Sequence, residues 1–307
     1  MPSKQPLIRI LALAALLATA INGRVSASGA GEGRSKPLAA ALDPVQAEEG
    51  FQAPAWPAMQ KAQKAFRRVL AGKAEPAEED FRPFGFTLRS VRLETGPALA
   101  VTDPPSDVRG RGFYVIDRDA SAPVLVQAPH RFKDLDTGAI VAELVAPGGF
   151  RAAAWNTIPR WAPDDRSDRS SDVAHIDASY FNAFTQAFAE AYPDGAVVQI
   201  HGFARGNRDT AAGRRADVIV SNGTRRLQGP ARAVHRCLDG ALDATVLGYG
   251  ETVFELGATT NRNAAALRRL GFQRFVHVEM VRDLRRRAVA EPALQERIRG
   301  CLLEAAP

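Results

Sequence analysis

The feature that most constrains this chain is the alternation of two hydrophobic patterns from residue 124 to the end. Compact apolar runs predict strands at 124–127, 150–155, 196–201, 216–220, 252–256 and 275–279. Between them, helices are predicted at 134–145, 176–192, 231–242, 263–270 and 282–303. This alternation predicts an α/β fold, with a mixed, mostly parallel sheet and helices on both of its faces.

Upstream of this region the pattern changes. Apolar and polar residues alternate in 84–118, which predicts short antiparallel strands or hairpins ahead of the main sheet. Residues 59–70 have helical spacing, so the folded part is expected to begin near residue 56 as a single domain, 56–307. Residues 28–55 are rich in Gly, Ala, Ser and Glu and predict a flexible N-terminal segment.

Residues 1–27 have the order of a cleavable signal peptide. Lys4 and Arg9 flank the start of an apolar run at 10–20, and Val25-Ser26-Ala27 supplies small residues at the −3 and −1 positions. The run is shorter than the about 20 residues that a permanent membrane helix needs, although an uncleaved anchor is the alternative. We therefore expect a periplasmic or secreted protein that has no membrane attachment once the signal is cleaved.

The charge and cysteine content narrow the function further. The formal net charge is +6, and it includes Lys4, Arg9 and Arg24, which would leave with the signal peptide. The small remaining excess does not predict a nucleic-acid partner. Cys237 and Cys301 are the two cysteines, and an oxidising compartment would permit a disulfide between them; two buried free thiols are the alternative.

Three predicted strands end in residues that bind metals or transfer protons. His130 follows Ala128-Pro129 at the end of the first strand, with Asp134 close behind it; His201 ends a later strand, and Glu279 ends the last one. Sites in open α/β sheets form beyond the carboxyl ends of strands, so we expect these side chains to meet.

Two histidines and a carboxylate form a typical catalytic zinc site with one position left for water, whose pKa the ion lowers toward neutrality. We predict His130, His201 and Asp134 as ligands, with Asp136 as the competing third ligand. Glu279 is predicted to carry a proton from the water to the leaving amine. A purely structural role is the alternative for each of these residues.

The other motifs of the chain do not point to a rival mechanism. His175 and His277 are weaker candidates for the site, and His175 could equally cap a helix; His235 falls on a predicted helix face. The sequence has no Gly-x-Ser-x-Gly elbow, P-loop or Gly-x-Gly-x-x-Gly motif, and neither cysteine is a convincing nucleophile. These absences favour a metal mechanism.

Three segments together resemble one enzyme family. The segments QAPHRFKD at 127–134, VVQIHGF at 197–203 and FVHVEMVRDLRR at 275–286 resemble the N-formylglutamate amidohydrolases, relatives of the zinc carboxypeptidases. The resemblance covers roughly residues 124–290 through these short motifs. It implies a zinc carboxypeptidase-like fold of the phosphorylase/hydrolase type, His130 and His201 as zinc ligands, and Glu279 as the catalytic glutamate.

The chain also departs from these families. Zinc carboxypeptidases place the acidic ligand three residues after the first histidine, where this chain has Lys133, so Asp134 and Asp136 both stay open. The formylglutamate enzymes are cytoplasmic, whereas this chain is expected to be exported. Their substrate is therefore not carried over, and peptides, cell-wall fragments or poly-γ-glutamate are the substrates we expect.

The function predicted from these features is an exported zinc-dependent hydrolase that cleaves a peptide or γ-glutamyl-type amide bond near a carboxylate. Arg205 and Arg208 follow His201 in the loop HGFARGNR and are candidate anchors, because arginine binds carboxylates through two parallel hydrogen bonds; an exposed basic loop is the alternative. The main rival is an exported non-catalytic binding protein that retains the fold. DNA binding through the Arg clusters is the least favoured hypothesis.

Overall fold

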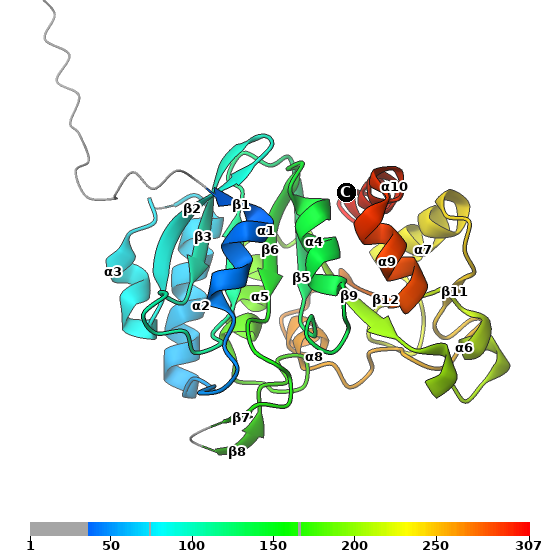
Figure 1. Cartoon of the computed structure of the whole chain (residues 1–307), viewed down its shortest axis with the longest axis horizontal. Coiled ribbons are helices and arrows are strands. Elements are labelled where there is room, and N and C mark those ends of the chain that lie inside the picture. The colour runs from blue at the N-terminus through cyan, green and yellow to red at the C-terminus, as the bar shows by residue number, and fades with distance from the viewer. Residues whose placement is uncertain (1–35, 74, 165–166) are drawn as a thin grey trace, which may run out of the picture. The chain divides into compact units, whose positions relative to one another are not determined.

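Ten strands form one mixed sheet, and helices pack on both of its faces (Figure 1). The computed structural model describes residues 36–73, 75–164 and 167–307. Across the sheet the strands run in the order β1 (Lys36–Pro37), β2 (Thr87–Leu93), β3 (Gly96–Thr102), β4 (Phe113–Ile116), β6 (Phe150–Trp155), β5 (Ala122–Ala128), β9 (Ala196–Phe203), β12 (Phe275–Val281), β10 (Val218–Ser221) and β11 (Val246–Gly248). Strands β7 (Pro163–Asp164) and β8 (Ser167–Ser170) pair antiparallel in a separate two-stranded sheet.

The centre of the sheet is parallel and its first part is antiparallel. Strands β6, β5, β9 and β12 are parallel neighbours, whereas β2, β3, β4 and β6 pair antiparallel. Near the far edge, β10 is antiparallel to β12 and parallel to β11. The predicted fold class is therefore confirmed, including the short antiparallel strands that precede the main sheet.

The helices of the described part fall into two layers. One face of the sheet is covered by α1 (Leu38–Leu42), α4 (Thr137–Val145), α7 (Gly229–Ala241), α9 (Arg282–Ala290) and α10 (Pro292–Leu303). The other is covered by α2 (Trp56–Leu70), α3 (Glu78–Phe81), α5 (Tyr180–Ala191) and α8 (Arg262–Arg269). The short helix α6 (Ala211–Arg215) follows β9.

The alternation of side chains along each strand divides the core between these layers. In β5, Val124 and Val126 face the first layer and Leu125 faces the second; in β9, Val198 and Val197 divide in the same way. Successive side chains of a strand point to opposite faces, so a central strand needs apolar residues in succession to bury both. This requirement explains the compact apolar runs of the sequence.

The folded part begins earlier than the sequence predicts. Leu38, Leu42, Val45 and Phe51 are buried, and β1 pairs with β2, so residues 36–55 belong to the domain and are not a flexible segment. Most residues of this stretch are small or polar, which is why the sequence predicts flexibility. Its few large apolar side chains are enough to attach it to the core. The predicted signal peptide, 1–27, and residues 28–35 lie outside the described residues.

The strand predicted at 252–256 is wrong. The edge strand is β11, and the segment after it makes only an isolated bridge between Tyr249 and Val253. Leu256 and Ala258 have φ angles of 62° and 53°, which a continuous extended strand cannot include. The segment is a loop, and the residues from Leu256 to Asn261 line the cavity described below.

The two cysteines are joined. Cys237 of α7 and Cys301 of α10 form a disulfide with an S–S distance of 2.00 Å and a Cα–Cα distance of 5.4 Å. Of the two alternatives from the sequence, the structure therefore has the bridge between late helices. The helix predicted at 282–303 is divided in two, because α9 ends at Ala290 and α10 begins at Pro292.

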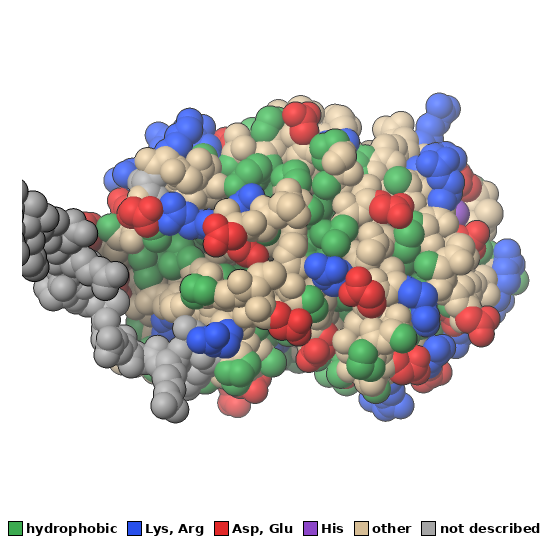
Figure 2. Space-filling view, turned by 90° about the horizontal axis from the view of Figure 1, so that it is seen from above, with side chains coloured by type: hydrophobic (Ala, Val, Ile, Leu, Met, Phe, Trp, Pro, Cys, Tyr) green, Lys and Arg blue, Asp and Glu red, His purple; other side chains and the backbone are tan. Residues whose placement is uncertain are grey.

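The surface of the domain mixes charges of both signs. Figure 2 shows one face, on which Lys and Arg side chains lie among Asp and Glu side chains. Several surface arginines have an acidic partner, such as Arg287 with Glu291 at 2.9 Å and Arg118 with Glu75 at 2.9 Å. Among the described residues, no helix has both the length and the apolar character that crossing a membrane requires.

Candidate metal centre

The strand register brings His201 and Glu279 together. Strands β9 and β12 are parallel neighbours, and His201 pairs directly with Glu279 in their ladder. Both residues point to the face that carries Val197 and Phe275, since side chains two apart on a strand share a face. Both residues line the same cavity.

A tight turn after β5 brings Asp134 back toward His130. The backbone N–H groups of Lys133 and Asp134 both donate to the carbonyl oxygen of His130, at 2.8 Å each. The Thr137 hydroxyl then donates to the Asp134 carbonyl at 2.7 Å as α4 begins. This turn explains how an acidic residue four positions after the histidine reaches the same site.

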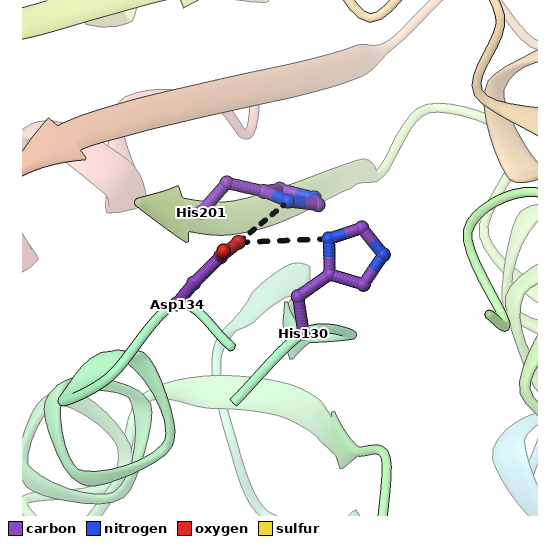
Figure 3. A group of neighbouring side chains, drawn as sticks. All are labelled: His130, Asp134 and His201. Atoms are coloured by element: carbon purple, nitrogen blue, oxygen red, sulfur yellow. Dashed lines mark ion pairs between the residues drawn. The ribbon is translucent and has the colours of Figure 1, made fainter. Parts of the chain in front are cut away.

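Two histidines and one carboxylate converge (Figure 3). The Asp134 Oδ2 atom lies 3.5 Å from His130 Nδ1 and 3.3 Å from His201 Nδ1. All three side chains are buried, and one ligand atom from each lies within 4.8 Å of the others. Asp136, the competing third ligand, belongs to none of the potential ligand groups of the described residues, so the geometry favours Asp134.

A second carboxylate holds the outer side of His130. The Asp172 Oδ1 atom lies 2.8 Å from His130 Nε2 and 3.0 Å from His175 Nδ1, and Arg160 pairs with Oδ2. A carboxylate on the far nitrogen of a histidine orients the ring and makes it a better ligand. Sequence reasoning missed this role of Asp172, although Asp172-Val173-Ala174-His175 was the signal beside it.

Burial and neighbouring charge act against each other in the pKa values. Burial by itself lowers the pKa of His130, but Asp134 and Asp172 outweigh burial and leave this pKa raised. Burial would raise the pKa of each carboxyl, yet the histidines bring both below their usual range. His201 has fewer acidic neighbours, and burial lowers its pKa to about 4, so its ring is neutral at neutral pH.

Glu279 is the acid of the site whose pKa is raised and not lowered. Burial, followed by the charge of Asp134, raises the pKa of Glu279 to about 8. Its Oε1 atom lies 3.6 Å from His277 Nε2, while Oε2 is buried without a hydrogen-bond partner. A buried carboxylate oxygen with no partner is costly, and a nearby cation or a bound water would satisfy it.

These groups border a cavity of about 610 Å³ whose lining is strongly basic. The cationic side chains along it are Lys133, Arg160, Arg208, Arg282 and Arg285. Arg285 donates to the carbonyl oxygens of Leu135 and Met280, and so ties α9 to the turn after β5 and to β12. A cavity of this size and charge suits a small acidic molecule.

Of the two arginines predicted to anchor a substrate, only one borders the cavity. Arg208 lines the cavity, and its buried Nε atom has no hydrogen-bond partner. Arg205 does not line it: its guanidinium pairs with Asp217, just before β10. The prediction of Arg205 as an anchor is therefore wrong, because the intervening 3-10 turn, Arg205–Asn207, points the two side chains to different places.

Glu255 holds the Arg208 loop in place. Its carboxylate accepts hydrogen bonds from the backbone N–H of Asp209 at 3.1 Å and of Thr210 at 3.0 Å, and it lies 3.5 Å from Arg208 Nη1. Glu255 is absent from the cavity lining, so its part is to support the loop rather than to contact a substrate.

The donor set fits a transition metal ion. Two imidazole nitrogens and a carboxylate oxygen lie within 4.8 Å of one another, and Glu279, whose buried Oε2 atom lacks a partner, pairs with His201 in the sheet. This combination of ligands suits zinc better than calcium or magnesium, which prefer oxygen ligands alone. Three sets of side chains among the described residues could hold an ion: His130, Asp134 and His201; His130, Asp172 and His175; and His201, His277 and Glu279. The first set is the one that the sequence predicts.

Comparisons with known proteins are weak in sequence and in structure. No family model matches the chain, and no curated protein matches it. Among solved structures, it is similar to N-formylglutamate amidohydrolase from Ralstonia eutropha JMP134, at 15% identity and a TM-score of 0.38 over 62% of this chain and 94% of that one.

Two further solved structures have related names. A candidate carboxypeptidase A from Shewanella denitrificans OS-217 matches at 10% identity and a TM-score of 0.38, over 72% of this chain and 64% of that one. An aspartoacylase family protein from Mesorhizobium loti MAFF303099 matches at 11% identity and a TM-score of 0.33, over 68% and 67%. The names include the family that the sequence motifs resemble, but TM-scores below 0.5 carry no conclusion about activity.

Proposed function

We propose that this chain is an exported zinc-dependent hydrolase that cleaves an amide bond, of peptide or γ-glutamyl type, near a carboxylate of its substrate. The observation that carries the proposal is the convergence of His130 Nδ1, His201 Nδ1 and Asp134 Oδ2 beside the unpartnered oxygen of Glu279. Catalytic zinc sites combine three such protein ligands with an open position.

The zinc ion and Glu279 would have different roles in this reaction. A zinc ion, when bound, would lower the pKa of a water molecule in the cavity and polarise the amide carbonyl. Glu279 lies next to His201 in the ladder and would accept the proton of that water and deliver it to the departing nitrogen. The pKa of about 8 belongs to the metal-free site, and the charge of a bound zinc ion would lower it, so that Glu279 would be ionised and able to accept the proton.

The substrate class is inferred from the lining of the cavity. Arg208 would bind a substrate carboxylate, since it borders the cavity and its Nε atom lacks a partner. We infer a small peptide-like or cell-wall-derived substrate and no role for nucleic acid or, after signal cleavage, for a membrane.

Export is part of the proposal. The order of charged, apolar and small residues in 1–27 supports it, and so does the disulfide between Cys237 and Cys301, which an oxidising compartment preserves. N-terminal sequencing of the exported protein from a bacterial host should give a start near Ser28. An intact Met1 on protein confined to the cytoplasm would contradict export.

The metal is tested by elemental analysis of the purified mature protein. We expect about one zinc ion per chain, and its loss in the double variant His130→Ala, His201→Ala, because the remaining ligand cannot hold the ion. The matched control is His235→Ala on α7, which belongs to none of the potential ligand groups and should keep its zinc. A double variant that still binds about one zinc ion per chain would show that the metal site lies elsewhere. A wild type that binds zinc but hydrolyses no carboxylate-bearing amide would favour the binding-protein alternative.

A further inference from the structure

The side of His201 that faces away from Asp134 meets a chain of buried polar side chains. Its Nδ1 atom is directed at Asp134, while its Nε2 atom lies 3.4 Å from the Gln199 Oε1 atom. These hydrogen-bonded side chains are all buried and take no part in the chemistry described above. They belong to Thr185, Gln127, Gln199, Asn263 and Asn261.

One end of this chain is oriented by a helix carbonyl. The Thr185 hydroxyl donates to the carbonyl oxygen of Phe181 at 2.8 Å, so its oxygen is left to accept from Gln127 Nε2 at 2.9 Å. The amide nitrogen of Gln127 is thereby placed toward Thr185, and its Oε1 atom accepts from Gln199 Nε2 at 3.0 Å. The direction of each bond follows from the one before it.

Two asparagines orient Gln199 independently. Asn263 donates through Nδ2 to the carbonyl oxygen of Val173 at 3.2 Å, so its Oδ1 atom accepts from Gln199 Nε2 at 2.9 Å. Asn261 caps α8 by accepting from the N–H of Ala264 at 2.9 Å, so its Nδ2 atom donates to Gln199 Oε1 at 2.8 Å. Three backbone anchors thus agree that the amide oxygen of Gln199 is the atom facing His201.

This orientation has a consequence for the proton on the histidine ring. A carbonyl oxygen can only accept a hydrogen bond, so the ring proton that satisfies Gln199 lies on Nε2. The lone pair of a neutral His201 is then on Nδ1, directed at Asp134 Oδ2 3.3 Å away. The partner of one ring nitrogen decides in this way which nitrogen is free to bind a metal.

We propose that Gln199 is a positioning residue that holds His201 with its proton on Nε2, so that Nδ1 is presented to the metal ion. This inference rests on the proposed zinc site and adds to it the residue that orients the second histidine. Asp172 performs the corresponding task for His130 with a charged acceptor. Gln199 performs it with a neutral amide, which must be oriented by its neighbours because either end could face the ring.

The zinc affinity of folded variants, measured by competition with a chromophoric chelator, tests this role. Gln199→Leu removes the acceptor and should weaken zinc binding by about ten- to a hundredfold, the usual effect of losing such a partner. Gln199→Glu retains an acceptor toward Nε2 but cannot donate to Gln127 Oε1 and Asn263 Oδ1, so its zinc affinity should lie between those of Gln199→Leu and the wild type. Thr185→Val is the matched control, because it cuts the same buried chain while Asn261 and Asn263 still orient Gln199.

Nuclear magnetic resonance of the ¹⁵N-labelled, zinc-loaded wild type gives a readout that needs no variant. The His201 ring proton should be found on Nε2, in slow exchange with water. Unchanged zinc affinity in Gln199→Leu, or a ring proton on Nδ1, would overturn the role of Gln199 and leave the zinc site standing. A wild type that binds no zinc would instead overturn the proposed function together with this inference.

Discussion

At the scale of single residues, the buried carboxyl of Glu279 separates an enzyme from a binding protein. Its Oε2 atom has no partner, although Glu279 lies in the ladder next to His201. Burying a carboxylate without a partner destabilises the fold, and a protein that only binds a ligand gains nothing from it. The proposed proton transfer would give this acid a role.

Glu279→Gln preserves the size of this side chain and removes the base. The rate on an acidic amide substrate should fall by at least about a hundredfold, since acid–base assistance is typically worth 10²- to 10⁴-fold. Zinc content should stay at the wild-type level, because Glu279 is not proposed as a ligand. Glu291→Gln, an exposed acid paired with Arg287, is the charge-matched control and should leave the rate unchanged. Loss of zinc in Glu279→Gln would make Glu279 a ligand.

The raised pKa of Glu279 also predicts how the metal-free protein responds to pH. Between the ordinary value of 4.5 and the folded value of about 8, the folded state holds a proton that the unfolded state has released. The unfolded state therefore binds fewer protons, and the contribution of Glu279 to stability falls as pH rises through this window. Each pKa unit corresponds to about 1.4 kcal/mol.

Glu279→Gln lacks this titration, so its stability relative to the wild type should increase from pH 5 to pH 8. Denaturant unfolding in the presence of a chelator measures the difference at each pH. A stability difference that stays constant across this range would show that the carboxyl of Glu279 titrates normally.

At the scale of elements, the loop after β9 decides which arginine can meet a substrate. Glu255 accepts hydrogen bonds from the backbone of this loop, and Arg208 lines the cavity while Arg205 pairs with Asp217. The segment that carries Glu255 is itself irregular, with positive φ at Leu256. The two loops are thus joined by hydrogen bonds at the border of the site.

Arg208→Ala should raise KM for a carboxylate-bearing amide by about ten- to a hundredfold, the worth of hydrogen bonds to a charged group. The kcat should change little, because Arg208 is placed to bind the substrate and not to transfer protons. Arg205→Ala in the same loop is the matched control and should leave KM within a few-fold. An equal increase of KM in both variants would mean that the loop as a whole, and not the Arg208 guanidinium, binds the substrate.

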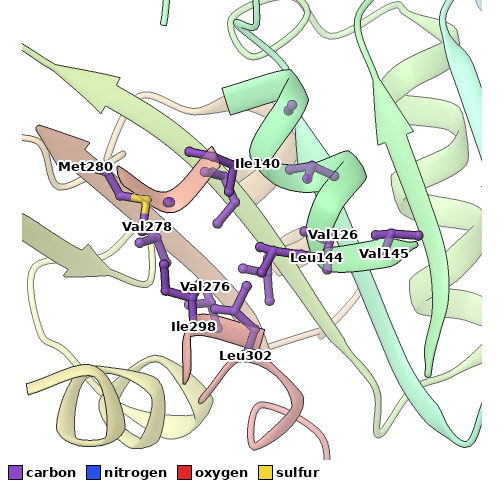
Figure 4. Packing of buried hydrophobic residues seen from close by; sticks show 14 of the residues in the cluster. Val126, Ile140, Leu144, Val145, Val276, Val278, Met280, Ile298 and Leu302 are labelled. Carbon is purple, nitrogen blue, oxygen red and sulfur yellow. The ribbon is translucent and has the colours of Figure 1, made fainter. Parts of the chain in front are cut away.

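At the scale of the whole molecule, both apolar packing and a disulfide attach the C-terminal helix α10 to the domain. Ile298 and Leu302 of α10 pack in the same buried cluster as Val276 and Val278 of β12 (Figure 4). The disulfide from Cys301 to Cys237 then ties α10 to α7 across a sequence separation of 64 residues. The covalent bond and the core therefore stabilise the same helix.

The double variant Cys237→Ala, Cys301→Ala should lose about 2–4 kcal/mol of unfolding free energy, as expected for closing a loop of this length. Zinc content should be retained, because neither cysteine borders the cavity. Denaturant unfolding with and without a reductant measures the effect, and the reductant should change the wild type alone. A wild type that is insensitive to the reductant would show that the bridge contributes nothing to stability.

Most elements of the domain, and the strands that carry the site, could be predicted from the sequence alone. Strands β5, β9 and β12 were recognisable because a buried central strand needs a compact apolar run, and His130, His201 and Glu279 stood out where those runs end. Periodicity is local information, so it also explains the failures. Sparse apolar residues in 36–55 were overlooked, and a β-rich composition at 252–256 suggested a strand that the positive φ of Leu256 prevents.

The partners of those residues were decided only by the tertiary structure. Asp172 reaches His130 from 42 residues away, and Gln199 is oriented by Asn261 from 62 residues away. The choices of Asp134 over Asp136, of Arg208 over Arg205 and of a disulfide over free thiols were likewise open until the fold was known. The periodicity of a strand predicts which face of the sheet a side chain points to. The order of the strands and the geometry of the loops determine which residues it contacts there.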